Sequence, residues 1–119
     1  MNLPLQETVR EIAPNDAVSK IAAKQAVLID VRDIAELNST GKAKDALHIP
    51  LMMISTKTDP KHPEFHADLS TETAVILYCA SGGRSGMAAQ MLLSYGFTEV
   101  YNLGGLMHWQ QGGGEVVRG

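Results

Sequence analysis

Residues 74–86 read AVILYCASGGRSG, and this stretch decides the fold class of the 119-residue chain. It opens with a continuous apolar run, which is typical of a strand buried on both faces of a sheet. A glycine-rich segment follows and leads into residues 86–95, where helix-forming residues continue up to Gly96, a residue type favoured just past a helix end. The stretch therefore predicts a strand, a tight loop and a helix in succession.

Strand-like and helix-like patterns alternate on both sides of this stretch. Apolar or β-branched runs predict strands at 27–31, 47–49 and 99–103, with a brief one at 11–13. Helical patterns occupy residues 3–10, 16–24, 34–38 and 106–111. This alternation indicates an α/β fold built on a mostly parallel sheet.

Glycines, prolines and caps predict how these elements are joined. Asn15 is expected to cap the helix at 16–24, and the proline-containing segment 55–68 to form a surface excursion bordering the active site. A tight turn is expected at 104–105 and a loose tail from 112–114 onward. Helical spacing places one set of side chains of the 86–95 helix in the core: Met87, Ala88, Met91, Leu92 and Tyr95.

Composition narrows the class of protein. With 45% hydrophobic residues, the chain suits a single domain over 1–119 with a core over about 12–111. Ten Lys plus Arg against 13 Asp plus Glu give a net charge of −3, without a basic block that would follow a phosphate backbone, so no nucleic-acid partner is expected. The sequence has neither a signal-peptide pattern nor a membrane span, which makes the cytoplasm the default location.

The four histidines do not predict a metal site. Only His62 and His66 have a ligand-like spacing of four residues. Pro63 directly follows His62, and the chain's one cysteine lies elsewhere in the sequence, so a surface loop explains this pair better than a metal ligand set. The loop at 82–86 also lacks the glycine order and the lysine of a nucleotide-binding motif, and no cofactor is expected.

Cys79 is the only cysteine and the predicted nucleophile. An ordinary cysteine is only about 3% thiolate at pH 7, so the loop has to favour the anion. Converging N–H groups at the helix start, the Arg84 charge and the Ser85 hydroxyl would each do so. Gly82 and Gly83 admit positive φ at no steric cost and let N–H groups point inward, and Ala80 and Ser81 leave room. Because a cation is unfavourable at a helix N-terminus, Arg84 is expected to be offset by a bound anion.

Three motifs in order resemble the rhodanese domain: residues 28–33, the loop 79–85, and residues 96–105 followed by Trp109. The resemblance covers about 12–111 and implies an open, mostly parallel sheet of about five strands with helices on both faces. It also implies sulfur transfer from a small anionic donor such as thiosulfate, through a covalent persulfide on Cys79, to cyanide, a thiol or a protein acceptor. Residues 80–85 would bind the donor. The protein would be a monomer or weak homodimer.

Asp30 and Arg32 lie at the end of the predicted strand 27–31 and allow two interpretations. They form either a structural ion pair or part of the site rim, and the structural pair is favoured because acidic side chains at strand ends often bond nearby backbone.

Two other functions stay open. A sulfur carrier or regulatory module would use the same pocket without efficient turnover. A cysteine phosphatase would need five residues between the cysteine and the arginine, whereas this loop has four, Ala80, Ser81, Gly82 and Gly83. The chain also departs from the family at 45–51, where DALHIPL lacks the usual glycines, so specificity stays open there. With one cysteine, the sulfur must leave to an external acceptor.

Overall fold

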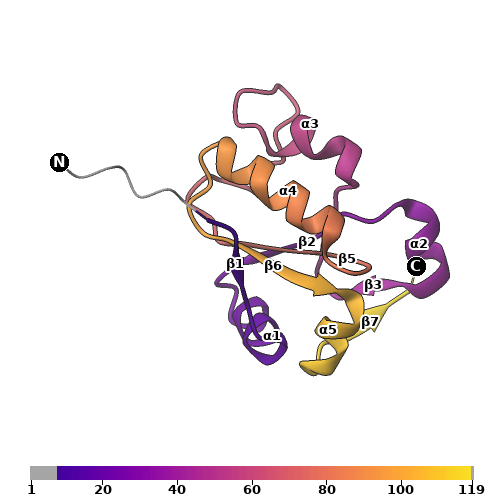
Figure 1. The fold of residues 1–119 in the computed structure, drawn as a ribbon. Helices are drawn as coiled ribbons and strands as arrows, with labels where there is room; N and C mark the ends of the chain where they lie inside the picture. Colours follow the sequence, from indigo (N-terminus) through magenta and orange to yellow (C-terminus); the bar gives the residue numbers. More distant parts are fainter. Residues whose placement is uncertain (1–7, 119) are drawn as a thin grey trace.

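The main sheet has five strands and is wholly parallel. The computed structural model describes residues 8–118, and its strand order is β1-β6-β5-β2-β4 (Figure 1). Every neighbouring pair in the order runs parallel, as the crossover helices require. The strands are β1 (Arg10–Glu11), β2 (Val27–Asp30), β4 (Leu47–His48), β5 (Val75–Cys79) and β6 (Val100–Gly105).

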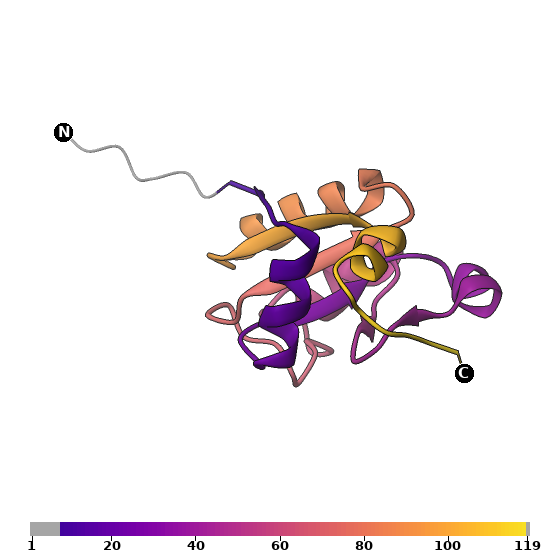
Figure 2. The same cartoon turned by 90° about the horizontal axis from the view of Figure 1, so that it is seen from below.

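Helices cover both faces of this sheet. In Figure 1, α3 and α4 lie above the strands and α1 and α5 below them, and Figure 2 shows α1 and α5 from below, in front of the sheet. The short α2 lies beyond the carboxyl ends of the strands. The helices are α1 (Pro14–Ala22), α2 (Ile34–Thr40), the 3-10 turn η1 (Leu51–Met53), α3 (Ile54–Thr58), α4 (Gly83–Ser94) and α5 (Leu106–Gln111).

Strand β5 divides the core into two clusters. All five of its residues are buried, which explains the uninterrupted apolar run. Val75, Leu77 and Cys79 belong to the cluster that includes Ala88 of α4, whereas Ile76 and Tyr78 belong to the cluster under α1 and α5. The alternation of side chains along β5 therefore points Cys79 toward α4.

The expected α/β architecture is confirmed, but helix starts and turns differ from the pattern. α1 begins at Pro14 with Ala13 as its N-cap, so the prediction of Asn15 as cap is wrong, because proline is well suited to a first helical position. The expected turn at 104–105 belongs instead to the end of β6, where the register with β5 shifts between Leu77 and Tyr78. The expected strand at 11–13 lies at 10–11. The helix expected at 3–10 falls largely outside the described residues.

The tail expected to be loose is docked on the fold. Strand β7 (Val116–Val117) pairs antiparallel with β3 (Lys42–Ala43). The Trp109 indole N–H donates to the Glu115 carbonyl at 2.8 Å. These side-chain and main-chain contacts hold the segment in place, although the glycines at 112–114 predicted a loose tail.

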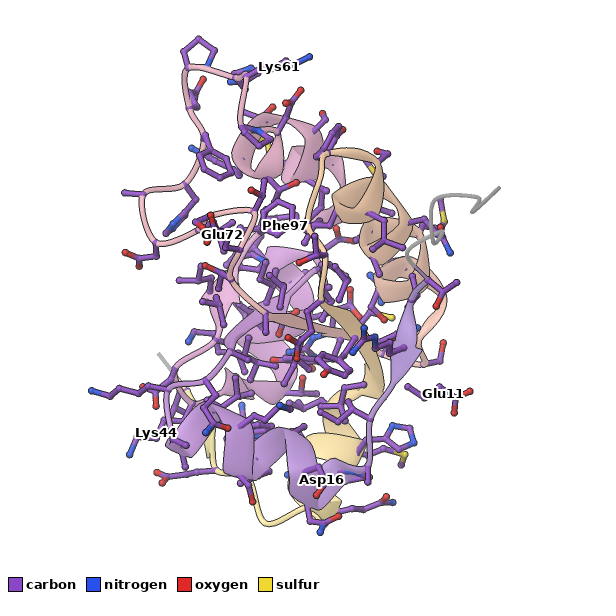
Figure 3. The ribbon with its side chains drawn as sticks, turned by 90° about the vertical axis from the view of Figure 1, so that its left-hand side faces the viewer. Glu11, Asp16, Lys44, Lys61, Glu72 and Phe97 are labelled. Atoms are coloured by element: carbon purple, nitrogen blue, oxygen red, sulfur yellow. The ribbon has the colours of Figure 1, made fainter. Side chains whose placement is uncertain are left out.

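The excursion lies away from the predicted site. Residues 54–58 form α3, and Asp59, Pro60 and Lys61 line a cavity together with Ser94 and Tyr95 at the carboxyl end of α4. Figure 3 shows Lys61 at the tip of this loop, pointing outward, while Phe97 lies inside the molecule. Because α4 begins beside Cys79, its other end is remote from the thiol, and the expectation that the excursion borders the site is wrong.

One of the methionines predicted to be in the core is exposed. Met87 is 61% exposed, whereas Ala88 and Leu92 are buried and Met91 is packed against the core. Met87 lies outside the helix face on which the buried side chains of α4 are spaced: Ser85, Ala88, Ala89 and Leu92.

Candidate active site

Cys79 lies at the carboxyl end of the central strand β5, where an open α/β sheet places its ligands. It is opposite Gly105 of β6, and a Cβ on Gly105 would overlap the Ala80 carbonyl. The absence of a side chain there lets β6 run close under the first residues of the loop.

The loop turns back over the sulfur at Gly82. This residue is the N-cap of α4 and has φ of +106°, a conformation that suits glycine. Its N–H donates to Cys79 Sγ at 3.0 Å. Gly83 already belongs to α4 and does not have positive φ, so of the two glycines only Gly82 uses this conformational freedom.

The loop holds the pKa of the Cys79 thiol at about 7, below its ordinary value. Burial raises this pKa, but hydrogen bonds outweigh the burial: one comes from the Ser85 hydroxyl, whose oxygen is 3.4 Å from Sγ, and others come from the amides of Ser85, Gly82 and Ser81. Near pH 7 about half of the protein would carry a thiolate. These contacts favour a thiolate near neutral pH and make Cys79 the candidate nucleophile, although the residue is only 1% exposed.

Asn102 of β6 organises these donors. Its Oδ1 accepts the Gly104 N–H at 3.0 Å. It also competes with Cys79 Sγ for the single Ser85 hydroxyl proton, because the Ser85 oxygen is 2.7 Å from Oδ1 and 3.4 Å from Sγ. Its Nδ2 donates to the Gly82 carbonyl at 3.0 Å. Our sequence reasoning missed Asn102, although a polar residue inside the apolar strand pattern of 99–103 was the available signal.

Arg84 forms a two-point ion pair with Glu36 of α2. The distances are 2.6 Å from Nη1 to Oε1 and 2.9 Å from Nη2 to Oε2. The pair raises the pKa of Arg84 and lowers that of Glu36 to about 2. The anion expected to offset Arg84 is thus supplied by the chain itself. Sequence reasoning missed Glu36, which lies 48 positions away and carries no motif of its own.

Asp30 and Arg32 form a buried network behind the loop. The Arg32 guanidinium donates to both Asp30 oxygens, to the Thr40 hydroxyl and to the Gly41 carbonyl. The Tyr78 hydroxyl donates to Asp30 Oδ2 at 2.5 Å. The network ties the ends of β2 and β5 to the end of α2, and Arg32 also lines the cavity beside Ala80. The pair therefore has a structural role, and its arginine also reaches the rim of the candidate site.

A shallow cavity of about 380 Å³ opens beside Ala80, the residue after the nucleophile. Leu106 and Met107 of α5 contribute apolar walls, and Arg118, brought there by β7, contributes a cation. Residues 8–118 contain no group of three or more His, Cys, Asp or Glu side chains that could hold a metal ion. None of the helices in this part of the chain is both long and apolar enough to span a membrane.

Known proteins with related sequences and structures match most of the chain. A sulfurtransferase of Allochromatium vinosum is 30% identical over 111 residues, which cover 92% of this chain and 95% of that protein. A Rhodopseudomonas palustris structure, described as a protein of unknown function and possible tyrosine phosphatase, has a TM-score of 0.80 at 27% identity, covering 92% of this chain and 85% of that one. A human single-domain sulfurtransferase has a TM-score of 0.74 at 24% identity, with coverage of 87% and 96%.

The family model for the rhodanese-like domain matches residues 13–112. This range runs from just before α1 to the end of α5 and includes the loop 79–85. With a strand-loop-helix unit around a lone, activated cysteine and this match over most of its length, the chain belongs to the rhodanese-like domain family.

Proposed function

We propose that the protein is a sulfurtransferase in which Cys79 takes a sulfane sulfur from a small anionic donor such as thiosulfate and passes it to a thiol, or to cyanide in an assay. The observation that carries the proposal is the Cys79 sulfur itself, with a pKa of about 7 and N–H and O–H donors directed at it from the start of α4. Membership of the rhodanese-like family supports the same reaction class.

The proposed reaction has two displacements at sulfur and needs no oxidant or reductant. The Cys79 thiolate attacks the outer sulfur of thiosulfate, an S–S bond forms, and the donor's own S–S bond breaks with its electron pair leaving on sulfite. The product persulfide, again an anion, lies where the amides of Ser81, Gly82 and Ser85 stabilise negative charge. An acceptor thiolate then attacks the outer sulfur, and Cys79 leaves as the thiolate.

The acceptor must come from outside the chain, because the sequence has no second cysteine. The cavity beside Ala80 offers an approach route. Its apolar walls at Leu106 and Met107 and its cation at Arg118 suit a small thiol that carries a carboxylate.

Phosphatase chemistry is the rival that the possible tyrosine phosphatase among the similar structures raises. Two observations disfavour it. The loop has four residues between Cys79 and Arg84, one fewer than the phosphatase loop. The two guanidinium nitrogens that would clamp a phosphoryl group already hold Glu36.

Intact mass measurement after thiosulfate treatment tests the proposal directly. We expect one added sulfur, about 32 Da, removed again by cyanide, and absent in Cys79→Ser. Steady thiocyanate production distinguishes a sulfurtransferase from a carrier, which would load once without turnover. Full sulfur transfer by Cys79→Ala would overturn both of these functions, and cysteine-dependent hydrolysis of an aryl phosphate would favour the phosphatase.

A further inference from the structure

We infer that Glu36 is a specificity-determining residue, which acts through Arg84 to make the site discriminate against doubly charged sulfur donors in favour of singly charged ones. This inference rests on the proposed function, since it concerns the donor of the same reaction. It assigns a role to a residue of α2 that takes no part in the displacement steps.

The first support is the geometry of the ion pair. Glu36 engages two nitrogens of the Arg84 guanidinium at 2.6 and 2.9 Å, a fork-to-fork contact of the kind that a sulfonate or phosphoryl group would otherwise make. A donor that binds Arg84 must therefore displace the carboxylate or share the guanidinium with it.

The second support is where the pair lies. Glu36 and Arg84 side chains are 32% and 33% exposed, so both charges face solvent at the open rim of the loop. Arg84 is two residues after the N-cap Gly82 and directly precedes Ser85, which contacts the sulfur. Arg84 is also close enough to Cys79 for the charge of the sulfur to contribute to the raised pKa of the guanidinium, so the pair lies within electrostatic range of a donor at the sulfur.

The third support is the sum of nearby charges. Glu36 is held ionised, with a pKa of about 2, and its Oε1 also accepts the Asp33 N–H at 3.1 Å. The Asp33 carboxylate is close enough to Arg84 to contribute to the raised pKa of the guanidinium. Arg84 and Arg32 thus face three carboxylates, Glu36, Asp33 and Asp30, before the Cys79 thiolate is counted. Repulsion by the excess negative charge is twice as large for a dianion as for a monoanion.

Two donors with the same reactive sulfur but different charge test this role. Thiosulfate is a dianion, whereas benzenethiosulfonate is a monoanion that leaves as a sulfinate. In Glu36→Gln the amide oxygen still accepts the Asp33 N–H and an Arg84 N–H, but the charge is removed. A unit charge about 6 to 7 Å away in a water-rich setting changes a monoanion's affinity about threefold and a dianion's about ninefold. We expect KM to fall by about those factors, with kcat within about twofold of the wild type.

Glu64→Gln is the matched control. Glu64 also pairs with a cation, Lys57 at 3.2 Å, but the pair lies on the excursion remote from Cys79. Neither KM should change in this variant. Equal changes of KM for both donors, or none, in Glu36→Gln would overturn the inference and leave Glu36 a structural residue.

A second variant keeps the test decisive if Glu36→Gln is unstable. Asp33→Asn removes the neighbouring charge while Glu36 still holds Arg84, and we expect the same order of donors with a smaller change, about twofold for thiosulfate. No preferential change for thiosulfate in this variant would count against the inference. If wild-type protein takes sulfur from neither donor in the mass measurement, the proposed function fails instead.

Discussion

Two arginine-carboxylate pairs stand close to Cys79, and they have different surroundings. Asp30 and Arg32 side chains are 0% and 4% exposed, whereas Glu36 and Arg84 are about one-third exposed. Arg32 has further partners in Thr40 and Gly41, while Arg84 has Glu36 alone among the hydrogen bonds described for its side chain in residues 8–118. The same chemical pair therefore serves as scaffold in one place and as an adjustable charge in the other.

Breaking the buried pair should have the largest effect. Arg32→Leu leaves the Asp30 carboxylate uncompensated in the core, which costs about 3–5 kcal/mol of unfolding free energy. Arg84→Met, the matched change in the exposed pair, should cost about 0–1 kcal/mol. Urea denaturation followed by far-UV circular dichroism measures both, and similar losses in the two variants would contradict the contrast drawn here.

The pKa of the Cys79 thiol should depend more on neutral hydrogen-bond donors than on either arginine. Ser85→Ala removes the hydroxyl hydrogen bond to Sγ, so the pKa of Cys79 rises from about 7 toward its ordinary value. The rate of alkylation by iodoacetamide, measured against pH, should shift its midpoint upward. A larger shift in Arg84→Met than in Ser85→Ala would assign the main effect to charge instead.

Acid should weaken the exposed pair. The pKa of Glu36 is lowered to about 2 in the folded state from an ordinary value of 4.5. Its contribution to stability is therefore present above about pH 4.5 and is lost as the pH falls toward 2. Screening at this exposed site limits the loss to under about 1 kcal/mol. The fall in unfolding free energy between pH 6 and pH 3 should be smaller in Arg84→Met than in the wild type, and an equal fall would contradict the assignment.

Added salt should have the smallest effect of these changes, and it should act on the stability difference between the wild type and the arginine variants. At about 0.5 M NaCl the Debye length is only a few ångströms, so the stability difference between wild type and Arg84→Met should nearly vanish. The difference for Arg32→Leu should persist, because the buried pair is little screened. Thermal melts in low and high salt make the comparison, and a salt-sensitive Arg32→Leu difference would show that the inner pair is open to water.

Local sequence patterns predicted most of the fold and the candidate nucleophile. The features that they missed depend on contacts between residues far apart in the sequence. Apolar runs identified β2, β5 and β6 because strands buried on both faces need continuous hydrophobicity. The glycine-rich loop identified Cys79 as the candidate nucleophile. The sequence did not identify Glu36 and Asn102, because they lie on other elements, 48 and 20 residues from the loop residues that they contact. The docking of β7 was missed for the same reason: its partner β3 lies more than 70 residues earlier.

The packing of Trp109 makes its intrinsic fluorescence a probe of the C-terminal segment. Trp109 is the single tryptophan, 3% exposed, with its N–H on the Glu115 carbonyl and its ring against Gly114. Arg118, three residues beyond Glu115, lines the cavity beside Ala80. Any detachment of the strand that opens this side of the cavity would expose the indole to water and shift its fluorescence to longer wavelength, so the motion can be followed during turnover in the unlabelled protein.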